Sequence, residues 1–515
     1  MWKNDFKPSY VLLKQSFVMK KFLYSVVLLL GLFSSLICAN MLSAQSPASY
    51  SHDVENKIKQ VEQNLGGWVR IEDHPTWTLQ ERMSHYKIKG LSIAVVHNYQ
   101  IEWARAYGWA DSAEQRPVTI QTVFQAASIS KSLNAVGVLK LVQDKKLDLY
   151  ADINNYLISW KFPYDSLSKN KKITIINLLS HTAGLSVHGF PGYSKTDTIP
   201  TVIEILDGKR PANSPAVRSQ FEPGLKFQYS GGGTTISQLI VMDITHQPYD
   251  KFMWENVLKP MGMTASFYTQ PPPGDRQSSL ATAYYADGKE VKGKYHIYPE
   301  EAPAGLWTNP TDLCKYIIET QLSYQGKSNK VLSQEFTRLR LTPSVDASAA
   351  LGVFIDKKGD AKYFEHGGSN EGFRCQYFGS VEGGDGVAVM VNSDNGGILQ
   401  EVINSVALAY GWKDFYKPAT KKVVSLTADQ LKGLEGKYQF EFRKGETSFI
   451  QITAKDNGIV LKQLWDGQEI SFLAESDLAF FSIDFPFTLK FTREANGAAT
   501  QVLALDRDLW KKVKE

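Results

Sequence analysis

The chain has 515 residues, of which 43% are hydrophobic and 21% are charged, and its formal net charge is +4 at pH 7. This length allows two or three domains with a sizeable core, and the composition excludes a disordered or fibrous protein. So weak a charge over so many residues gives no reason to expect a nucleic acid partner.

The first predicted feature is an export signal within residues 1–45. Met19 and two lysines precede the apolar stretch FLYSVVLLLGLFSSLICA, which gives the charged start and apolar core of a secretory signal. We therefore predict export with cleavage of this segment. The apolar run is just long enough for an uncleaved membrane anchor, which remains the alternative. Beyond the signal the remaining cysteines are Cys314 and Cys375, and the sequence leaves open whether they pair.

Residues 46–412 show the pattern of an α/β domain with a helical insertion. GLSIAVVHNYQIEWARAYGWAD (90–111) predicts two strands around a polar turn, and FRCQYFGSVEGGDGVAVMVNSD (373–394) predicts a second hairpin. An apolar helix is expected over 398–410. Further helical segments lie between the hairpins, separated by Pro- and Gly-rich loops, at 130–147, 237–245 and 310–322. We expect one sheet assembled from both ends of the domain and placed against the inserted helices.

The C-terminal part has a different pattern. KDFYKPATKKVV (413–424) is polar, basic and contains proline, which predicts a linker. Over 425–515, short alternating segments are separated by Asp-Asn-Gly, Asp-Gly and Ala-Asn-Gly turns. This spacing predicts a small antiparallel barrel or sandwich of about 90 residues.

The first chemical candidate is Ser128 with Lys131, in TVFQAASISKSLNAVGVLKLV. Ser128 is expected at a strand-to-helix junction, where the helix dipole would stabilise an anion on its oxygen. Lys131 shares its helix face, and a buried lysine loses its proton readily, which suits a base that activates serine. The alternative is a helix-capping serine with a surface lysine. The same spacing starts at Ser166 and Ser168 in the polar loop DSLSKNKK, where it carries no chemistry.

Two later segments supply further candidates. Tyr229, in FEPGLKFQYSGGG, would be a phenolate-like base if a lysine lowered its pKa, or else an aromatic packing residue. In YFEHGGSNEGF, Gly367 and Gly368 would let the backbone approach a ligand and offer N–H groups to an oxyanion. His366 is either a substrate contact or an edge histidine. No Gly-x-Ser-x-Gly segment is present, which disfavours an α/β-hydrolase.

Taken in order, these three segments resemble the serine β-lactamase and penicillin-binding protein superfamily. The resemblance is to its class C-like branch of D-aminopeptidases, D,D-peptidases and esterases, and covers roughly residues 50–412. Three more segments are similar to that branch: ITIINLLSHTAGL (173–185), VLKPMGMTASFY (257–268) and APAGLWTNPTDL (302–313). The resemblance implies a transpeptidase-like α/β sheet flanked by helices, and the tail resembles the lipocalin-like barrel that some such hydrolases carry.

The resemblance also implies an acyl-enzyme mechanism. Ser128 would attack a carbonyl, with Lys131 and Tyr229 sharing the proton transfers. Backbone N–H groups of Ser128 and Ser369 would form the oxyanion hole, and water would release the acyl group without metal or cofactor. The expected partner is a small-molecule or peptide substrate, and the expected location is the bacterial periplasm, with contact to the membrane only through the signal or anchor. The oligomeric state stays open.

Two departures from the family motifs concern the substrate. Gly231 stands where the family's Tyr-x-Asn motif has an asparagine, so an amide able to bind an acylamino group is missing. His366 stands where β-lactamases and D,D-peptidases have the lysine of Lys-Thr-Gly, and histidine, with an ordinary pKa of about 6.5, is mostly neutral at pH 7. The predicted function is a serine hydrolase acting on small esters, amides or D-amino acid peptides. The alternatives are a β-lactamase or D,D-carboxypeptidase, and a non-catalytic binding protein.

Overall fold

The computed structural model describes residues 50–168, 170–494 and 498–513. The chain divides into two compact units, Met1–Glu55 and Asn56–Glu515, and the second holds every described element except the first turn of α2 (His52–Gln63). The predicted export signal lies outside the described residues. Among the residues that are described, no helix has both the length and the apolar character needed to cross a membrane.

A seven-stranded antiparallel sheet lies at the centre of the second unit, in the order β4-β3-β2-β10-β9-β8-β7. Its strands are β2 (Gly90–His97), β3 (Gln100–Asp111), β4 (Arg116–Pro117), β7 (Phe354–Lys358), β8 (Ala361–Asn370), β9 (Phe373–Ser380) and β10 (Gly386–Val391). The early and late strands meet where β2 pairs with β10, with Ile93 opposite Val389. The predicted sheet, assembled from both ends of the fold, is therefore confirmed.

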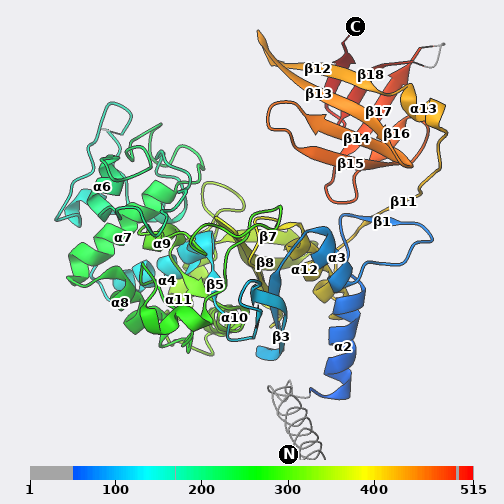
Figure 1. Cartoon of the computed structure of the whole chain (residues 1–515). Helices are drawn as coiled ribbons and strands as arrows, with labels where there is room; N and C mark the ends of the chain where they lie inside the picture. Colours follow the sequence, from blue (N-terminus) through cyan, green and yellow to red (C-terminus); the bar gives the residue numbers. More distant parts are fainter. Residues whose placement is uncertain (1–49, 169, 495–497, 514–515) are drawn as a thin grey trace, which may run out of the picture. The chain divides into compact units, whose positions relative to one another are not determined.

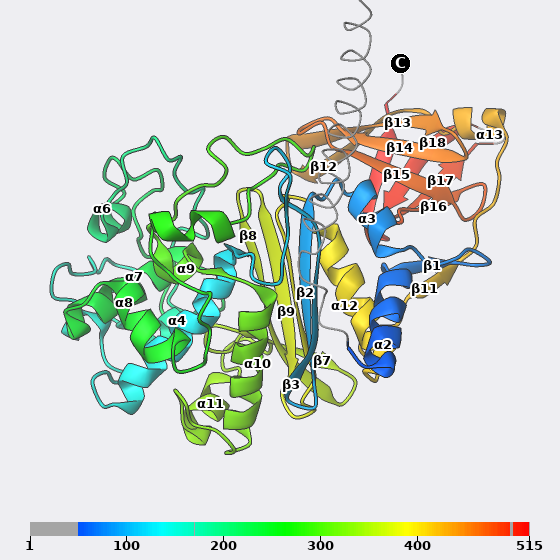
Figure 2. The ribbon, with the colours of Figure 1, turned by 60° about the horizontal axis from the view of Figure 1, so that its bottom comes forward.

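Helices cover both faces of this sheet (Figure 2). α10 (Pro310–Tyr324) packs on β2, β3, β9 and β10, and α12 (Gly397–Ala409) packs on β9 and β10 from the other side. Every residue of β10 is buried, as are all but the last of β2. A strand covered on both faces needs apolar side chains on both, which explains why these two segments are almost entirely apolar.

The helical insertion lies beside the sheet and is shown in cyan and green in Figure 1. Its helices are α4 (Ser130–Gln143), α5 (Ile175–Leu179), α6 (Val202–Asp207), α7 (Gly231–Thr245), α8 (Tyr249–Met253), α9 (Glu301–Ala304), α10 and α11 (Gln334–Arg340). α4 is buried almost all round, so it lacks an amphipathic pattern. α7 begins six residues before the predicted start, because the Ser230 hydroxyl accepts a hydrogen bond from Gly233 N (2.9 Å) and caps a helix that opens with three glycines.

The C-terminal segment forms a closed eight-stranded antiparallel barrel, which decides between the barrel and the sandwich (Figure 1). Its strands are β12 (Gly436–Arg443), β13 (Glu446–Lys455), β14 (Gly458–Gln463), β15 (Glu469–Ala474), β16 (Ala479–Phe481), β17 (Thr488–Arg493), β18 (Ala499–Ala504) and β19 (Asp508–Lys512). The pairing of β12 with β19, with Tyr438 opposite Lys512, closes the barrel. Tyr438, Ile450 and Phe472 belong to its buried core.

The predicted linker differs from expectation in one detail. The predicted linker contains a short strand, β11 (Ala419–Lys421), which pairs in parallel with β1 (Val69–Ile71). A polar, basic composition does not prevent this pairing, because the backbone supplies its hydrogen bonds.

Cys314 and Cys375 are both free and buried, so they do not pair. The remaining short α-helices and strands are α3 (Leu79–His85), β5 (Phe124–Gln125), β6 (Trp307–Thr308) and α13 (Ala428–Lys432).

Candidate active site

Ser128 lies in a tight turn between a short strand and a buried helix. β5 ends at Gln125, a single 3-10 turn covers Ala127–Ile129, and α4 begins at Ser130. Ala127 has a φ of +48°, a left-handed conformation that is strained for a residue with a side chain. Ser128 is only partly buried, whereas both of its neighbours are fully buried. The turn therefore presents the Ser128 hydroxyl at the surface of the core.

Lys131 lies one turn further along, beneath this hydroxyl. Its Nζ is 3.0 Å from Ser128 Oγ and donates a hydrogen bond to the carbonyl of Pro303 at 2.8 Å. The side chain is 4% exposed, and burial lowers the pKa of Lys131 to about 7. No carboxylate forms an ion pair with Lys131 among the described residues. A fraction of the amine is therefore neutral at pH 7 and able to accept the serine proton.

Tyr229 completes a triangle with these two side chains. It precedes α7, and its ring centroid is 4.9 Å from Lys131 Nζ. Burial raises the pKa of Tyr229, and its weaker interaction with the Ser128 hydroxyl acts in the opposite direction. The expected lowering of this pKa is therefore not found, and Tyr229 is a phenol that holds its proton at neutral pH.

His181 is a further residue beside the candidate site. It lies in the segment ITIINLLSHTAGL (173–185), where the sequence predicts no functional role for it. Its ring lies 4.3 Å from the Tyr229 ring, and its Nδ1 accepts a hydrogen bond from Ser230 N at 3.2 Å. Burial, followed by the nearby Lys131, lowers the pKa of His181 well below the ordinary value. A neutral His181 therefore supports the tyrosine loop. Its residue type alone gives no sign of this packing.

Strand β8 brings the third predicted segment against the Ser128 turn. A Cβ at Gly368 would lie 2.3 Å from the carbonyl oxygen of Ala126 and 2.4 Å from Cys375 Sγ, so only glycine fits there. The next residue, Ser369, is exposed beside the turn. Strand β8 therefore packs against the Ser128 turn at the residue before Ser369, as expected if the Ser128 and Ser369 backbone N–H groups form an oxyanion hole.

A further polar group holds the end of β8. Asn370 Nδ2 donates to Gln125 Oε1 at 2.8 Å and to the carbonyl of Ala304 at 3.1 Å. These bonds connect β8 both to β5, which leads into the Ser128 turn, and to α9, whose Pro303 carbonyl binds Lys131. Sequence reasoning gave neither Asn370 nor Gln125 a role, because their contacts join segments distant in sequence.

His366 is buried, and a hydrogen bond fixes its tautomer. Its Nδ1 is 2.6 Å from the carbonyl oxygen of Gly367, which can only accept, so Nδ1 carries the hydrogen. Burial, followed by the charge of Lys131, lowers the pKa of His366 to about 3. Nε2 is therefore an unprotonated acceptor, and it is buried without a hydrogen-bond partner among the described residues. The site presents a neutral acceptor where the related motif has a cation.

The space beside Gly231 is filled by an aromatic ring. A Cβ at this position would lie 2.9 Å from Phe190 Cε2 and 3.4 Å from the carbonyl of His188. Gly231 is itself buried as the first residue of α7. An asparagine side chain at this position would therefore collide with Phe190, so the missing amide is accompanied by a change in the packing around it.

Replacing Gly368 with alanine should disturb both the fold and the site. The added methyl group meets the backbone of Ala126, which cannot move without shifting the Ser128 turn, so we expect unfolding free energy to fall by roughly 1–3 kcal/mol. Displacement of the backbone N–H groups should lower kcat/KM by about a hundredfold. Denaturant unfolding and steady-state kinetics measure the two effects. Gly367→Ala is the stability control, since its nearest contact would be an ordinary 3.8 Å; equal stability of the two variants would contradict the packing argument.

Comparisons with known proteins place this chain in a family. The Beta-lactamase family model matches residues 77–409, more than half of the chain. Protein flp of Staphylococcus aureus strain N315 is 24% identical over 317 residues, covering 59% of this chain and 60% of flp. A Beta-lactamase of Pseudomonas fluorescens is 28% identical over 258 residues, covering 50% of this chain and 66% of that protein. The alignment thus spans about 60% of the length of the first of these curated relatives.

Solved structures show the same fold at low identity. The octameric penicillin-binding protein homologue from Pyrococcus abyssi has a TM-score of 0.58 at 20% identity, covering 84% of this chain and 98% of that one. The D-amino acid amidase from Ochrobactrum anthropi SV3, complexed with L-phenylalanine, has a TM-score of 0.54 at 20% identity, covering 70% and 98%. The family match covers Ser128, Lys131, Tyr229 and the whole of β8. The chain belongs to the Beta-lactamase family.

Proposed function

We propose that this protein is a serine hydrolase that forms an acyl-enzyme on Ser128 and acts on small esters, amides or D-amino acid peptides. The observation that carries the proposal is the Lys131 amine, 3.0 Å from Ser128 Oγ and buried deeply enough to bring its pKa to about 7. A lysine with this environment is matched to proton transfer at neutral pH.

In the acylation step, neutral Lys131 takes the Ser128 proton as Oγ attacks the substrate carbonyl. The hydrogen bond to the Pro303 carbonyl holds the amine so that its lone pair remains available to the serine. Backbone N–H groups of Ser128 and Ser369 stabilise the oxyanion. The Tyr229 phenol, which keeps its proton, protonates the leaving group and is reprotonated from the Lys131 ammonium.

Water then attacks the acyl-enzyme and the same groups act in reverse. Tyr229 takes a proton from the attacking water as it passes its own proton to the neutral Lys131 amine, and the Ser128 oxygen leaves with that proton from Lys131. These steps use the side chains and backbone of this chain alone. The signal-like segment within residues 1–45 supports the further proposal that this chemistry takes place after export, in the bacterial periplasm.

Two features support substrates other than penicillins or D-Ala-D-Ala ends. The neutral His366 supplies no positive charge to hold a substrate carboxylate, and Phe190 fills the space beside Gly231 where an amide would bind an acylamino group. The structural similarity to a D-amino acid amidase is consistent with a small aminoacyl substrate. The alternative, a β-lactamase or D,D-carboxypeptidase, is supported by the similarity to the Pseudomonas fluorescens Beta-lactamase.

A comparison of three substrates separates these two functions. We expect kcat/KM for p-nitrophenyl acetate or D-alanine p-nitroanilide to exceed that for nitrocefin by at least about tenfold. The loss of one charge-assisted hydrogen bond to the substrate lowers kcat/KM by about this factor. Absorbance assays at one pH, on the same enzyme preparation, measure all three. Faster turnover of nitrocefin than of both other substrates would favour the alternative.

A further inference from the structure

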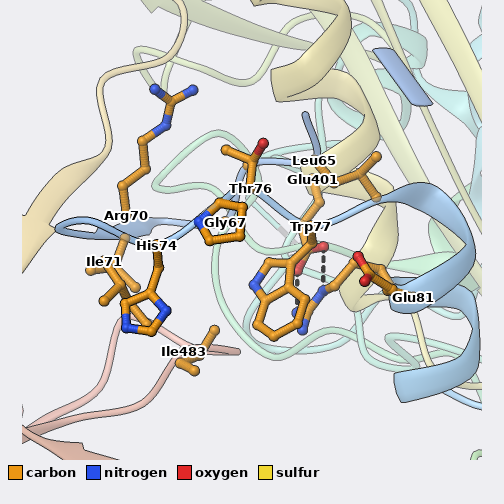
Figure 3. Close-up of a pocket in the computed structure, with 14 residues that line it drawn as sticks. Leu65, Gly67, Arg70, Ile71, His74, Thr76, Trp77, Glu81, Glu401 and Ile483 are labelled. Carbon is orange, nitrogen blue, oxygen red and sulfur yellow. Dashed lines mark hydrogen bonds and ion pairs between the residues drawn. The ribbon is translucent and has the colours of Figure 1, made fainter. Parts of the chain in front are cut away.

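A groove of about 530 Å³ lies between α11, the end of α10 and the edge strand β7 of the central sheet. Three basic residues line it, Arg338 of α11, Lys357 of β7 and Lys362 of β8, and all three are exposed. Among the described residues that line this groove there is no carboxylate. The cavity beside β1 differs in this respect, because Glu81 and Glu401 belong to its lining (Figure 3). The groove is therefore a concave surface with positive charge alone.

The pairing of β7 with β8 places two of these cations side by side. Lys357 lies directly opposite Lys362 in the antiparallel register, and Ile355 lies opposite Phe364. Alternate residues of a strand share a face, so all four side chains lie on one side of the sheet. That side faces α10, because the Phe364 ring contacts Tyr316 of this helix. Directly opposite residues have Cβ atoms about 5 Å apart, and like charges in such a pair repel each other. An anion between the two lysines would relieve this repulsion.

No carboxylate of the described chain forms an ion pair with either lysine. Asp356 and Glu365 belong to the same two strands, but the alternation of side chains places them on the opposite face of the sheet. On that face Asp356 pairs with Lys358 at 3.0 Å. Asp346, in the loop beside the groove, accepts hydrogen bonds from the backbone N–H groups of the second and third residues after it, at 2.8 and 3.1 Å. The positive charge of the groove is therefore not neutralised by these acidic neighbours.

Arg338 adds a third positive charge, and its position is fixed. Its Nε donates to the carbonyl of Tyr324 at 3.2 Å, and its guanidinium lies over the Tyr324 ring, 5.3 Å from the centroid. These contacts involve Nε and one face of the group. The two Nη groups form no hydrogen bond within the described part of the chain. They remain available to a ligand of the groove, and such paired N–H groups match the oxygens of a phosphate group.

The remaining surface of the groove is largely apolar. Leu341, Ile355 and Val381 lie buried beneath it, whereas Pro343 and Ala347, in the loop after α11, are more accessible. The volume falls within the range of small-molecule sites and exceeds what a phosphate group alone would fill. A ligand therefore has room for an organic body beside its charged group.

We propose that this groove binds a small organic phosphate monoester. The phosphate group lies between Lys357 and Lys362 and accepts hydrogen bonds from Arg338, and the organic body packs along Pro343 and Ala347. A phosphate monoester carries nearly two negative charges at neutral pH, so it neutralises both opposed lysines, whereas a carboxylate neutralises one. The site is independent of the proposed hydrolase activity, because it shares no residue with the proposed catalytic group.

Calorimetric titration of the full chain at about pH 8, where a phosphate monoester is dianionic, tests this proposal. The probes are phenyl phosphate, its monoanionic diester methyl phenyl phosphate, and inorganic phosphate. We expect phenyl phosphate to bind most tightly of the three. Lys357→Gln and Lys362→Gln should each weaken its binding by about tenfold or more, because each substitution removes one charge-assisted hydrogen bond.

Lys358→Gln is the matched control, because Lys358 follows Lys357 in the same strand but lies on the other face, paired with Asp356. It should bind phenyl phosphate as tightly as the parent. Thermal unfolding shows that the variants are folded and gives a second measurement. Without ligand, Lys357→Gln should melt at or above the temperature of the parent, since the repulsion between the opposed lysines is gone. Phenyl phosphate should raise the melting temperature of the parent more than that of Lys357→Gln.

The proposal is overturned if phenyl phosphate shows no saturable binding, if either groove variant binds it as tightly as the parent, or if Lys358→Gln loses as much affinity. It is also overturned if inorganic phosphate or methyl phenyl phosphate binds as tightly as phenyl phosphate. A loss confined to Lys357 and Lys362 and to the dianionic monoester supports it. Ester hydrolysis by the groove variants should equal that of the parent, so the outcome does not depend on the proposed hydrolase function.

Discussion

Ser128→Ala is expected to lower kcat/KM for ester hydrolysis by at least about a thousandfold and to abolish labelling by an active-site serine probe. The nucleophilic oxygen is removed while the turn that presents it stays intact, because alanine fits wherever serine does. Mass spectrometry of the labelled parent should find the probe on the peptide that contains Ser128. The oxyanion donors and substrate contacts remain in the variant, so a small residual rate is consistent with this role.

Ser166→Ala is the control for this prediction. Ser166 also has a lysine three residues later, but it is exposed in a polar loop, so its loss should leave labelling and turnover unchanged. Labelling of a different serine in the parent protein would refute the assignment of Ser128. A parent protein that neither takes up the probe nor hydrolyses any of the three substrates would instead support the non-catalytic alternative.

The second large effect is the dependence of activity on pH. Burial lowers the pKa of Lys131 from 10.5 to about 7, and only the neutral amine accepts the serine proton. kcat/KM should therefore be constant well above pH 7, fall as the pH decreases through 7, and lose about tenfold per pH unit below it. Lys131→Met should lower kcat/KM about a thousandfold and remove this inflection. Rate measurements from pH 5 to about pH 9 test the profile.

Two variants identify the group responsible for the inflection. Lys140→Met, on the same helix, removes a half-buried lysine paired with Asp144 and should keep both rate and profile. His366→Gln should keep an inflection near pH 7 even if its rate falls, because the lowered pKa of His366, about 3, leaves it neutral throughout this range. An inflection that disappears in His366→Gln but persists in Lys131→Met would assign the titration to the histidine instead.

Much of the fold could be predicted from local patterns. The long apolar runs in β2 and β10 and the polar turns beside them indicate buried antiparallel strands, and the turn residues after residue 424 indicate a small β domain. The start of α7 could not be predicted, because three glycines normally indicate a loop, and the Ser230 cap and the packing of the helix overrule that preference. The strand β11 could not be predicted from local pattern either, because it forms by pairing with β1, which lies some 350 residues earlier in the chain.

The sequence by itself determined which residue types are available to the site: a serine three positions from a lysine, a tyrosine before a glycine-rich turn, and a histidine followed by two glycines. It did so because short motifs depend on local spacing. Only the tertiary structure decided their protonation. Lys131 is close to neutral, Tyr229 keeps its proton and His366 is a neutral acceptor because each is buried among segments from distant parts of the chain. Desolvation depends on everything that surrounds a group, and no single stretch of sequence contains that information.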